Sequence, residues 1–360
     1  MTSSSSTPPP QDHPAETADP WWRRRRLVGA AGLSLVAVVV GTSVLVTRDP
    51  DGGAPPTTAV PGASVGGDWM SGASGPGVVE GDFAEWRGSP VEIAGTWSDN
   101  TEAMTELWQL QPGAEYADWQ KPMDLAIGAI GEGETWAEAA AGAYDARWTA
   151  TLEEAREVWA GREGQLYLRF AHESNGNWYP WAVDASEKDD FIAAWRHFRE
   201  LQQAVMPEAE LVFCLNRESV ETGFDWRESF PGAEYVDVLG VDYYNHYPYV
   251  DTAEEWQESL LATDRYGAPK GLQGYADFAA SVGLPLAVPE WSGVADQGDS
   301  PVFVESMNDY FAQHGGTGPG QVLYEILFDV DNEDYDGNFL LYGATKMPES
   351  AAAYQRRWAG

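Results

Sequence analysis

Residues 165–173 read QLYLRFAHE, an apolar run of strand length that ends in a carboxylate. A helix with apolar residues at three- and four-residue spacing is expected next, at 188–205, and a second apolar run, ELVFCLN, follows at 210–216. Strand, helix and strand in this order form the unit of a parallel sheet that is covered by helices. The stretch 165–216 therefore favours an α/β fold.

Apolar runs and helical segments alternate on both sides of this stretch. Further strands are expected at 91–97, 106–110, 123–130, 235–244, 284–290 and 321–328, and further helices at 146–160, 252–263, 270–282 and 302–314. Eight strands separated mostly by helices predict a (β/α)8 TIM barrel, for which about 250 residues are typical. A doubly wound open sheet is the alternative, but no Gly-x-Gly-x-x-Gly fingerprint follows a strand to bind a nucleotide.

Composition narrows the classes of partner. The chain of 360 residues has 21 Lys and Arg against 57 Asp and Glu, a formal net charge of −36, which disfavours nucleic acid as a partner. Its single cysteine, Cys214, lies in an apolar run and can form neither an intrachain disulfide nor a thiolate metal cluster. Aromatic residues make up 12% of the chain, a surplus that suits both core packing and the stacking of sugar faces.

A long apolar segment lies near the N-terminus. Residues 27–47, LVGAAGLSLVAVVVGTSVLVT, carry no charge and as a helix could cross the roughly 30 Å hydrocarbon layer of a membrane. Four arginines precede it, so the positive-inside rule places the N-terminus in the cytoplasm and the rest of the chain outside. A cleaved signal peptide, which would give a secreted protein, is the alternative, but no small-x-small cleavage site follows directly.

These patterns divide the chain into four parts. We expect a disordered cytoplasmic tail at 1–26, a transmembrane signal anchor at 27–47, a flexible linker rich in Pro, Gly and Thr at 48–79, and the barrel domain at 80–360. The expected location is the cell membrane, with a single span and an extracytoplasmic domain.

Two carboxylates end apolar strands, where a charge is costly unless it is used or paired. Glu173 ends QLYLRFAHE and Glu290 ends LPLAVPE. Since the C-terminal strand ends of a barrel meet at the face that carries reactive groups, the pair fits the acid and the nucleophile of a glycosidase. A carboxyl separation of about 5 to 5.5 Å would retain anomeric configuration and one of about 6.5 to 9.5 Å would invert it. Alternatively, each glutamate only pairs with an arginine such as Arg169.

The run LRFAHESNGNWYPW, at 168–181, resembles the acid/base signature of glycoside hydrolase family 26, in which an Arg precedes His-Glu, Asn-Gly and two tryptophans. The matching residues are Arg169, His172, Glu173, Asn175, Gly176, Trp178 and Trp181. Downstream, Asn216, then Asp242 and Tyr244 in GVDYYN, then Glu290 in VPEW follow the order of the family's motifs. The sequence departs from the family at Phe170, at Ser174 and at the last strand, which ends ILFD where many members place a Trp beneath the sugar.

The resemblance implies a retaining endo-β-glycanase with Glu173 as acid/base and Glu290 as nucleophile, and with no cofactor or metal. Its expected substrate is a β-linked polysaccharide or oligosaccharide, first β-1,4-mannan, with β-1,3-xylan and mixed-linkage β-glucan as alternatives. The expected substrate-binding residues are His172, Trp178, Trp181, Asp242, Tyr244, Arg169, Asn175, Asn216, Trp97 and Trp291. Tyr244 is expected to donate to the carboxylate of Glu290 and Arg169 to stabilise its charge.

Two further hypotheses remain open. A catalytically weak glycan-binding or cell-envelope polysaccharide assembly protein could use the same fold, although binding alone does not require two strand-end acids. The acidic stretch DVDNEDYDGN at 329–338 has the density of a calcium loop but not the EF-hand spacing, which favours a solvated loop at the rim of the cleft.

We predict that residues 27–47 stay on the mature protein as its anchor, because the arginine block precedes them and no cleavage site follows. N-terminal sequencing of the membrane-extracted protein should detect no new N-terminus within residues 48–68. A mature protein that begins there would contradict the anchor while leaving export intact.

Overall fold

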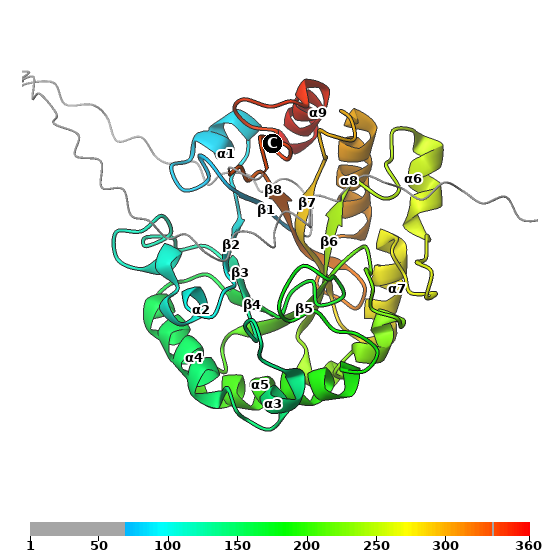
Figure 1. The fold of residues 1–360 in the computed structure, drawn as a ribbon. Helices are drawn as coiled ribbons and strands as arrows, with labels where there is room; N and C mark the ends of the chain where they lie inside the picture. Colours follow the sequence, from blue (N-terminus) through cyan, green and yellow to red (C-terminus); the bar gives the residue numbers. More distant parts are fainter. Residues whose placement is uncertain (1–68, 333–334) are drawn as a thin grey trace, which may run out of the picture.

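The computed structural model describes residues 69–332 and 335–360, and its strands close into a barrel (Figure 1). Eight parallel strands pair in chain order, and the last pairs with the first. The strands are β1 Met70–Ser74, β2 Ile93–Ser98, β3 Met123–Ile127, β4 Leu166–Phe170, β5 Glu210–Asn216, β6 Val238–Tyr244, β7 Leu286–Ser292 and β8 Val322–Phe328. The predicted (β/α)8 barrel is therefore confirmed.

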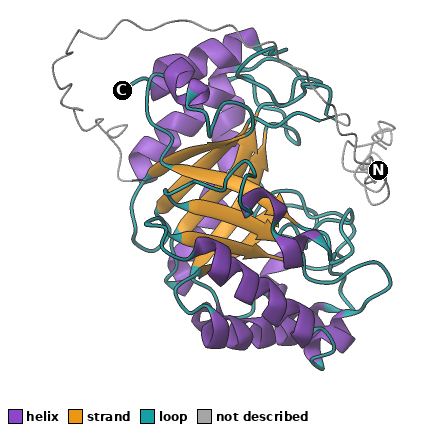
Figure 2. Ribbon diagram, turned by 90° about the vertical axis from the view of Figure 1, so that its left-hand side faces the viewer, coloured by secondary structure: helices purple, strands orange, loops and turns teal. Residues whose placement is uncertain are grey.

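Helices surround the strands on the outside, as the side view shows (Figure 2). The α-helices are α1 Asp82–Arg87, α2 Ala103–Glu106, α3 Trp136–Ala140, α4 Asp145–Trp159, α5 Lys188–Val205, α6 Ala253–Leu260, α7 Leu272–Val282, α8 Pro301–His314 and α9 Pro348–Trp358. Short 3-10 helices are η2 Trp108–Leu110, η3 Trp226–Ser229 and η4 Ala233–Tyr235. Each of the five predicted helices is present within about three residues of its expected bounds.

Side chains at the helix starts explain where several helices begin. Thr252 and Glu255 form a capping box at the start of α6, in which each side chain bonds the other's backbone N–H. Ser300 caps α8 by accepting from the N–H of Phe303, and Pro301 occupies the first helical turn. These caps join residues that are close in the sequence, so the helix starts do not depend on tertiary contacts.

Apolar side chains pack on both surfaces of the barrel wall. The larger cluster fills the space between strands and helices and includes Trp148, Trp195 and Trp291. A smaller cluster shares the inward-facing positions of the strands, and its members are Ile93, Tyr167, Val212, Cys214, Val238, Ala287, Tyr324 and Ile326. Cys214 is buried there, as the sequence indicated.

The expected strand at 91–97 is present as β2, but the structure differs from expectation at β1 and at residues 106–110. β1 lies in the segment that we expected to be linker, because MSGAS has a single large apolar side chain and shows no strand pattern. Its pairing on both edges holds it, with Gly72 beside Ile93 and Ile326. A Cβ at Gly72 would lie 2.3 Å from the carbonyl oxygen of Ile93, so this close contact requires glycine. Residues 106–110, expected to be a strand, instead end α2 and form η2.

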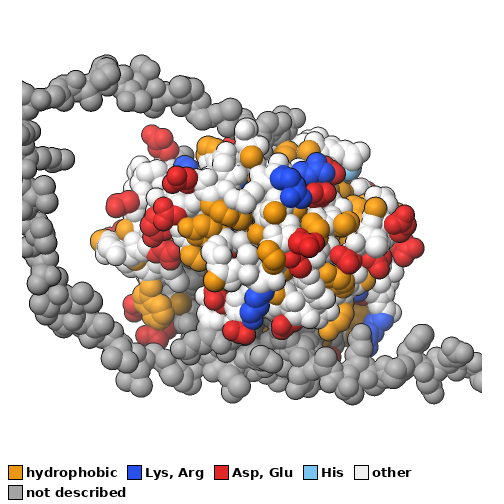
Figure 3. All heavy atoms as spheres, turned by 90° about the horizontal axis from the view of Figure 1, so that it is seen from above, with side chains coloured by type: hydrophobic (Ala, Val, Ile, Leu, Met, Phe, Trp, Pro, Cys, Tyr) orange, Lys and Arg blue, Asp and Glu red, His pale blue; other side chains and the backbone are white. Residues whose placement is uncertain are grey.

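The expected tail and membrane anchor, at 1–26 and 27–47, lie outside the described residues. Within residues 69–332 and 335–360, no helix combines the length and the apolar character that a membrane span requires. Acidic side chains are scattered over the face of the domain in Figure 3, in keeping with the large negative net charge.

We expect Trp358→Ala to destabilise the barrel strongly. Trp358 is fully buried on α9, stacks on Trp291 at 5.4 Å between ring centroids, and donates from Nε1 to Ser71 Oγ at 3.0 Å. Its loss leaves a large cavity beside β1, which should lower the free energy of unfolding by about 3 to 5 kcal/mol in urea titrations.

Trp108→Ala is the matched control, because Trp108 is 44% exposed and its loss should cost under about 0.5 kcal/mol. Equal urea midpoints for the two variants would refute the role of α9 in holding the barrel together.

Candidate active site

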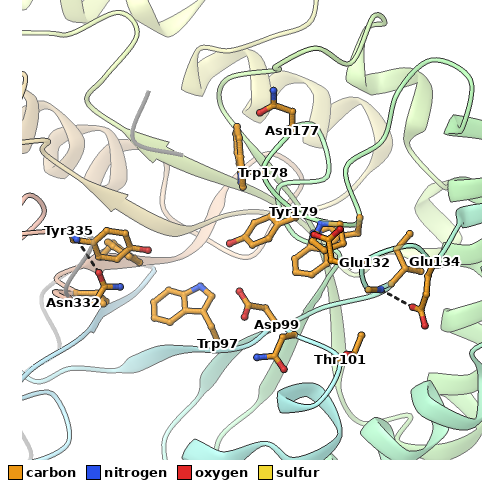
Figure 4. A pocket seen from close by; sticks show the side chains of 17 residues that line it. Trp97, Asp99, Thr101, Glu132, Glu134, Asn177, Trp178, Tyr179, Asn332 and Tyr335 are labelled. Carbon is orange, nitrogen blue, oxygen red and sulfur yellow. Dashed lines mark hydrogen bonds between the residues drawn. The ribbon is translucent and has the colours of Figure 1, made fainter. Parts of the chain in front are cut away.

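A cleft of about 960 Å³ lies at the C-terminal ends of the strands. Its walls come from the segments that follow β2, β3, β4 and β8, and Figure 4 shows Trp97, Asp99, Trp178, Tyr179 and Tyr335 around it. The cleft therefore opens at the barrel face where the two strand-end acids were expected to meet.

Glu173 lies in a tight turn beyond β4, three residues after the end of the strand. The expected strand was too long because Ala171 and Glu173 both adopt φ of 52°, the left-handed region that non-glycine residues avoid. Backbone bonds hold this turn, from Ala171 N to Ile127 O at 3.1 Å and from Glu173 N to Cys214 O at 3.0 Å. Strain at such positions costs about 1 to 3 kcal/mol each and is typical of functional sites.

Two donors hold the buried carboxylate of Glu173. Asn216 donates from Nδ2 to Oε1 at 2.6 Å, and Trp178 donates from Nε1 to Oε2 at 2.7 Å. Gly176 makes room for this arrangement, because a Cβ there would lie 2.4 Å from the ring of Trp178. The Asn-Gly-x-Trp part of the motif is thereby explained by packing around Glu173.

Glu290 points into the barrel because β7 contains one extra residue. Ala287 pairs with Gly240, but the next pair joins Glu290 to Asp242, so three steps on β7 match two on β6. Regular alternation would have turned Pro289 inward and Glu290 outward. Proline lacks the N–H that a regular ladder would use, and a bulge of this kind re-aims a side chain.

Both oxygens of Glu290 accept hydrogen bonds. Trp97 Nε1 and Arg169 Nη1 donate to Oε1 at 2.7 and 2.8 Å, and Tyr244 Oη donates to Oε2 at 2.5 Å. The contacts expected from Tyr244 and Arg169 are thus present in the structure. Such charge-assisted bonds favour the ionised carboxylate.

Arg169 is fully buried and binds three acidic side chains inside the barrel. Besides Glu290 it contacts Asp242 at 3.2 Å and donates from Nε to Asp124, whose other oxygen accepts from Tyr324 Oη at 2.6 Å. Burial raises the pKa of Asp124 and of Asp242, the charge of Glu290 raises the pKa of Asp242 further, and Arg169 opposes both effects.

Sequence reasoning missed Asp124. It lies in the run MDLAIGAI, where a single acid in a buried strand was the available signal. In the pairing of β3 with β4, Ala126 is the neighbour of Arg169, and Asp124 lies two positions before Ala126 on the same face of the sheet. This register makes the ion pair between Asp124 and Arg169 possible.

The carboxylates of Glu173, Asp242 and Glu290 form a compact group. One oxygen of each lies within 4.8 Å of the others, a spacing that a divalent cation could also bridge. However, Arg169 already places a positive charge against Glu290 and Asp242, and both oxygens of Glu290 accept from protein donors. The donor set therefore suits two closely spaced reactive carboxyls better than a metal.

The aromatic residues predicted to bind sugar divide into two groups. Trp97 and Trp178 line the cleft and also donate to Glu290 and Glu173. Trp181 also lines the cleft although it is only 2% exposed, and its ring stacks on Tyr179 at 4.3 Å with 13° between the planes. Trp291 was wrongly assigned to the site, because alternation after Glu290 turns it outward against α9.

The polar candidates also lie mostly behind the cleft. His172 is buried and its Nε2 lies 3.1 Å from Tyr179 Oη and 4.0 Å from Asp99. Asn175 is buried too, and it binds the backbone of Asn216 with both ends of its amide instead of lining the cleft.

The acidic stretch at 329–338 is only partly solvated. Asp329 is buried and accepts from the backbone N–H groups of Leu341 and Tyr342, and burial raises its pKa to about 7. Tyr335 lines the cleft, as a rim loop would. Residues 333 and 334 lie outside the described part.

We expect Arg169→Met to be strongly destabilising at pH 7, by about 3 to 5 kcal/mol, because it leaves buried carboxylates without their cation. A carboxyl whose pKa is raised by folding takes up its proton more readily when folded, so such a protein gains stability as the pH falls. Removing Arg169 raises the pKa values of Asp124 and Asp242 further. The loss of unfolding free energy relative to the wild type should therefore become smaller between pH 7 and pH 4 in urea titrations.

Arg227→Met is the control for the loss of an arginine. Arg227 pairs with Asp225 near the surface, where an ion pair contributes about 0 to 1 kcal/mol. A deficit for Arg169→Met that stayed constant with pH would contradict the electrostatic account.

Comparisons with known proteins find one matching family model and several relatives of low identity. Residues 146–265 match the family model described as Glycosyl hydrolase family 26. The chain is 27% identical over 197 residues to Endoglucanase H of Acetivibrio thermocellus, covering 53% of this chain and 20% of that protein. It is 24% identical over 220 residues to Mannan endo-1,4-beta-mannosidase A and B of Caldalkalibacillus mannanilyticus, covering 54% of this chain and 40% of that protein. The aligned parts span less than half the length of these relatives.

Solved structures show the same fold. The catalytic domain of the Bacillus sp. JAMB-750 GH26 endo-beta-1,4-mannanase superposes with a TM-score of 0.57 at 14% identity, covering 82% of this chain and 88% of that one. A modular endo-beta-1,4-mannanase from Cellulomonas fimi superposes with a TM-score of 0.55 at 15% identity, covering 81% of this chain and 71% of that one. At this level of identity the likeness concerns the fold alone.

Proposed function

We propose that this chain, whose residues 146–265 match the model of glycoside hydrolase family 26, hydrolyses a β-linked glycan by a retaining double displacement. The observation that carries the proposal is the pair of buried glutamates, Glu173 and Glu290. A carboxylate oxygen of Glu173 lies within 4.8 Å of one of Glu290, and each carboxylate accepts hydrogen bonds from its own donors. This short spacing supports retention, because inversion leaves room for a water between carboxyls about 6.5 to 9.5 Å apart.

Glu290 is the proposed nucleophile. Arg169, Tyr244 and Trp97 donate to its two oxygens and keep it ionised. In the first step a Glu290 oxygen attacks the anomeric carbon, the glycosidic C–O bond breaks, and the departing oxygen takes the proton of Glu173. The product of this step is a glycosyl ester on Glu290.

Glu173 is the proposed acid and then base. Once Glu290 is esterified its negative charge is gone, and a neighbouring carboxylate is then easier to keep ionised. In the second step Glu173 accepts a proton from water, the water oxygen attacks the anomeric carbon, and the ester bond to Glu290 breaks. The sugar leaves with its original configuration, and both glutamates return to their starting states.

We propose β-1,4-mannan as the substrate. Two of the curated relatives are named mannan endo-1,4-beta-mannosidases, which supports an endo-acting mannanase, whereas the relative named Endoglucanase H keeps a glucan as an alternative. Phe328 stands at the end of β8 where many family members have Trp, and it contacts Trp97 edge-on at 5.3 Å. Reducing-sugar release from mannan, β-1,3-xylan and mixed-linkage β-glucan would distinguish the substrates.

A catalytically weak glycan-binding protein is the second candidate function. Phe328 favours it, because a nearly buried Phe at the end of β8 offers a sugar less ring surface than the Trp of many family members. Binding of a glycan without release of reducing ends would support it. Under either function, we propose that the barrel acts outside the membrane, held by residues 27–47.

Replacement of each glutamate by alanine should separate the two roles. Glu290→Ala should abolish turnover of every glycoside, by at least about 10⁴-fold, because no glycosyl ester can form. Glu173→Ala should still cleave an activated aryl glycoside in the first step, because a phenolate needs little protonation to leave, and should then stall for want of a base.

Azide supplies the stereochemical readout. With Glu173→Ala, azide should attack the glycosyl ester on Glu290, restore turnover and give a glycosyl azide of retained configuration. With Glu290→Ala, azide could only attack the substrate directly and give inverted product. NMR of the products settles the configuration. The opposite pattern would exchange the two roles, and full activity of both variants would place the reaction elsewhere.

A further inference from the structure

Tyr275 connects the outer helix layer to the candidate active site. It lies on α7, is fully buried, and donates from Oη to the backbone carbonyl of Asn216 at 3.1 Å. Asn216 in turn holds Oε1 of Glu173. A hydroxyl outside the barrel wall therefore lies two contacts away from the proposed acid/base.

Hydrogen bonds fix Asn216 at both its backbone and its side chain. Asn175 donates to its carbonyl oxygen at 2.7 Å and accepts from its N–H at 2.9 Å. The side-chain Oδ1 of Asn216 accepts from Glu218 N at 2.9 Å, which leaves Nδ2 facing Glu173. The direction of Nδ2 therefore depends on where the peptide group of Asn216 is held.

Most of these contacts come from one short segment. Asn175 and Trp178 belong to the same turn as Glu173, so a shift of that turn would move all three together. The turn is also strained at Glu173, whose φ is 52°. Tyr275 ties Asn216 to a different element, and it thereby holds the donor of Glu173 in place independently of the turn.

The ring of Tyr275 is itself held rigidly. It stacks on Trp226 with 4.9 Å between centroids and 8° between planes, and Trp226 donates from Nε1 to Pro269 O at 2.9 Å. Burial raises the pKa of the Tyr275 hydroxyl well above its ordinary value, so the group stays protonated and remains a donor throughout the working pH range.

We propose that Tyr275 is a positioning residue for acid catalysis, which through Asn216 sets the direction from which Glu173 delivers its proton to the leaving oxygen. The inference rests on the proposed function. Proton transfer depends on the geometry of the donor, and it matters most when the leaving group is poorly stabilised as an anion.

The test compares leaving groups in Tyr275→Phe, which removes the hydroxyl and keeps the ring on Trp226. The substrates are phenyl and dinitrophenyl β-glycosides of the sugar that the wild type cleaves. For the phenyl glycoside, kcat/KM should fall about 2- to 10-fold, the range expected for one hydrogen bond. For the dinitrophenyl glycoside, whose departure needs little protonation, kcat/KM should change by less than about 2-fold.

Tyr310→Phe is the matched control. Tyr310 lies on α8, and its hydroxyl donates to Gln273 Oε1 at 3.2 Å, on the same helix as Tyr275. Within the described part of the chain, Gln273 bonds Tyr310 and Asp277 and not Asn216. This variant should leave the ratio of the two kcat/KM values at the wild-type level. Thermal unfolding midpoints of both variants show whether they are equally well folded.

A double-mutant cycle supplies a second readout. If Tyr275 acts through Glu173, adding Tyr275→Phe to Glu173→Ala should lower kcat/KM for the phenyl glycoside by less than about 2-fold further. The proposal would be overturned if Tyr275→Phe lowered kcat/KM for the phenyl glycoside as much in the Glu173→Ala background as in the wild type. It would also be overturned if Tyr275→Phe alone lowered kcat/KM equally for the phenyl and the dinitrophenyl glycoside. A wild type that releases no reducing sugar from mannan, β-1,3-xylan or mixed-linkage β-glucan refutes the proposed function itself, which is a different result.

Discussion

The buried guanidinium of Arg169 is the positive charge that allows several carboxylates to lie inside this barrel. Arg169 contacts the buried carboxylates of Asp124, Asp242 and Glu290, so three acidic groups surround one cation. An unpaired charge at such depth costs several kcal/mol, and the group is tolerable because neutral donors satisfy the remaining oxygens. Those donors, Tyr324, Tyr244 and Trp97, come from three different strands, so the charge cluster ties the barrel together across its axis.

Backbone irregularities aim the two glutamates. Glu290 turns inward because β7 carries an extra residue opposite β6, and Glu173 reaches the axis from a turn held at positive φ. Neither feature is the lowest-energy local conformation. Both persist because several hydrogen bonds from neighbouring elements hold them, which is the usual way in which a fold maintains local strain at a site.

Tryptophan side chains serve both the candidate site and the packing of the outer layer. Trp97 and Trp178 border the cleft and donate to Glu290 and Glu173, while Trp291 and Trp358 stack outside the wall. The high content of tryptophan therefore reflects two demands, and for Trp97 and Trp291, which lie on strands, the strand face decides which demand each one meets.

The sequence by itself determined the alternation of strands and helices, the barrel class and the pair Glu173 and Glu290, because periodicity and short motifs are local properties. It could not identify β1, whose MSGAS gains its strand conformation only by pairing on both edges. Nor could it separate Trp97 from Trp291, find Asp124 or connect Tyr275 to Asn216. Only the tertiary structure decided these, because barrel closure, the β7 bulge and helix packing set which distant side chains meet.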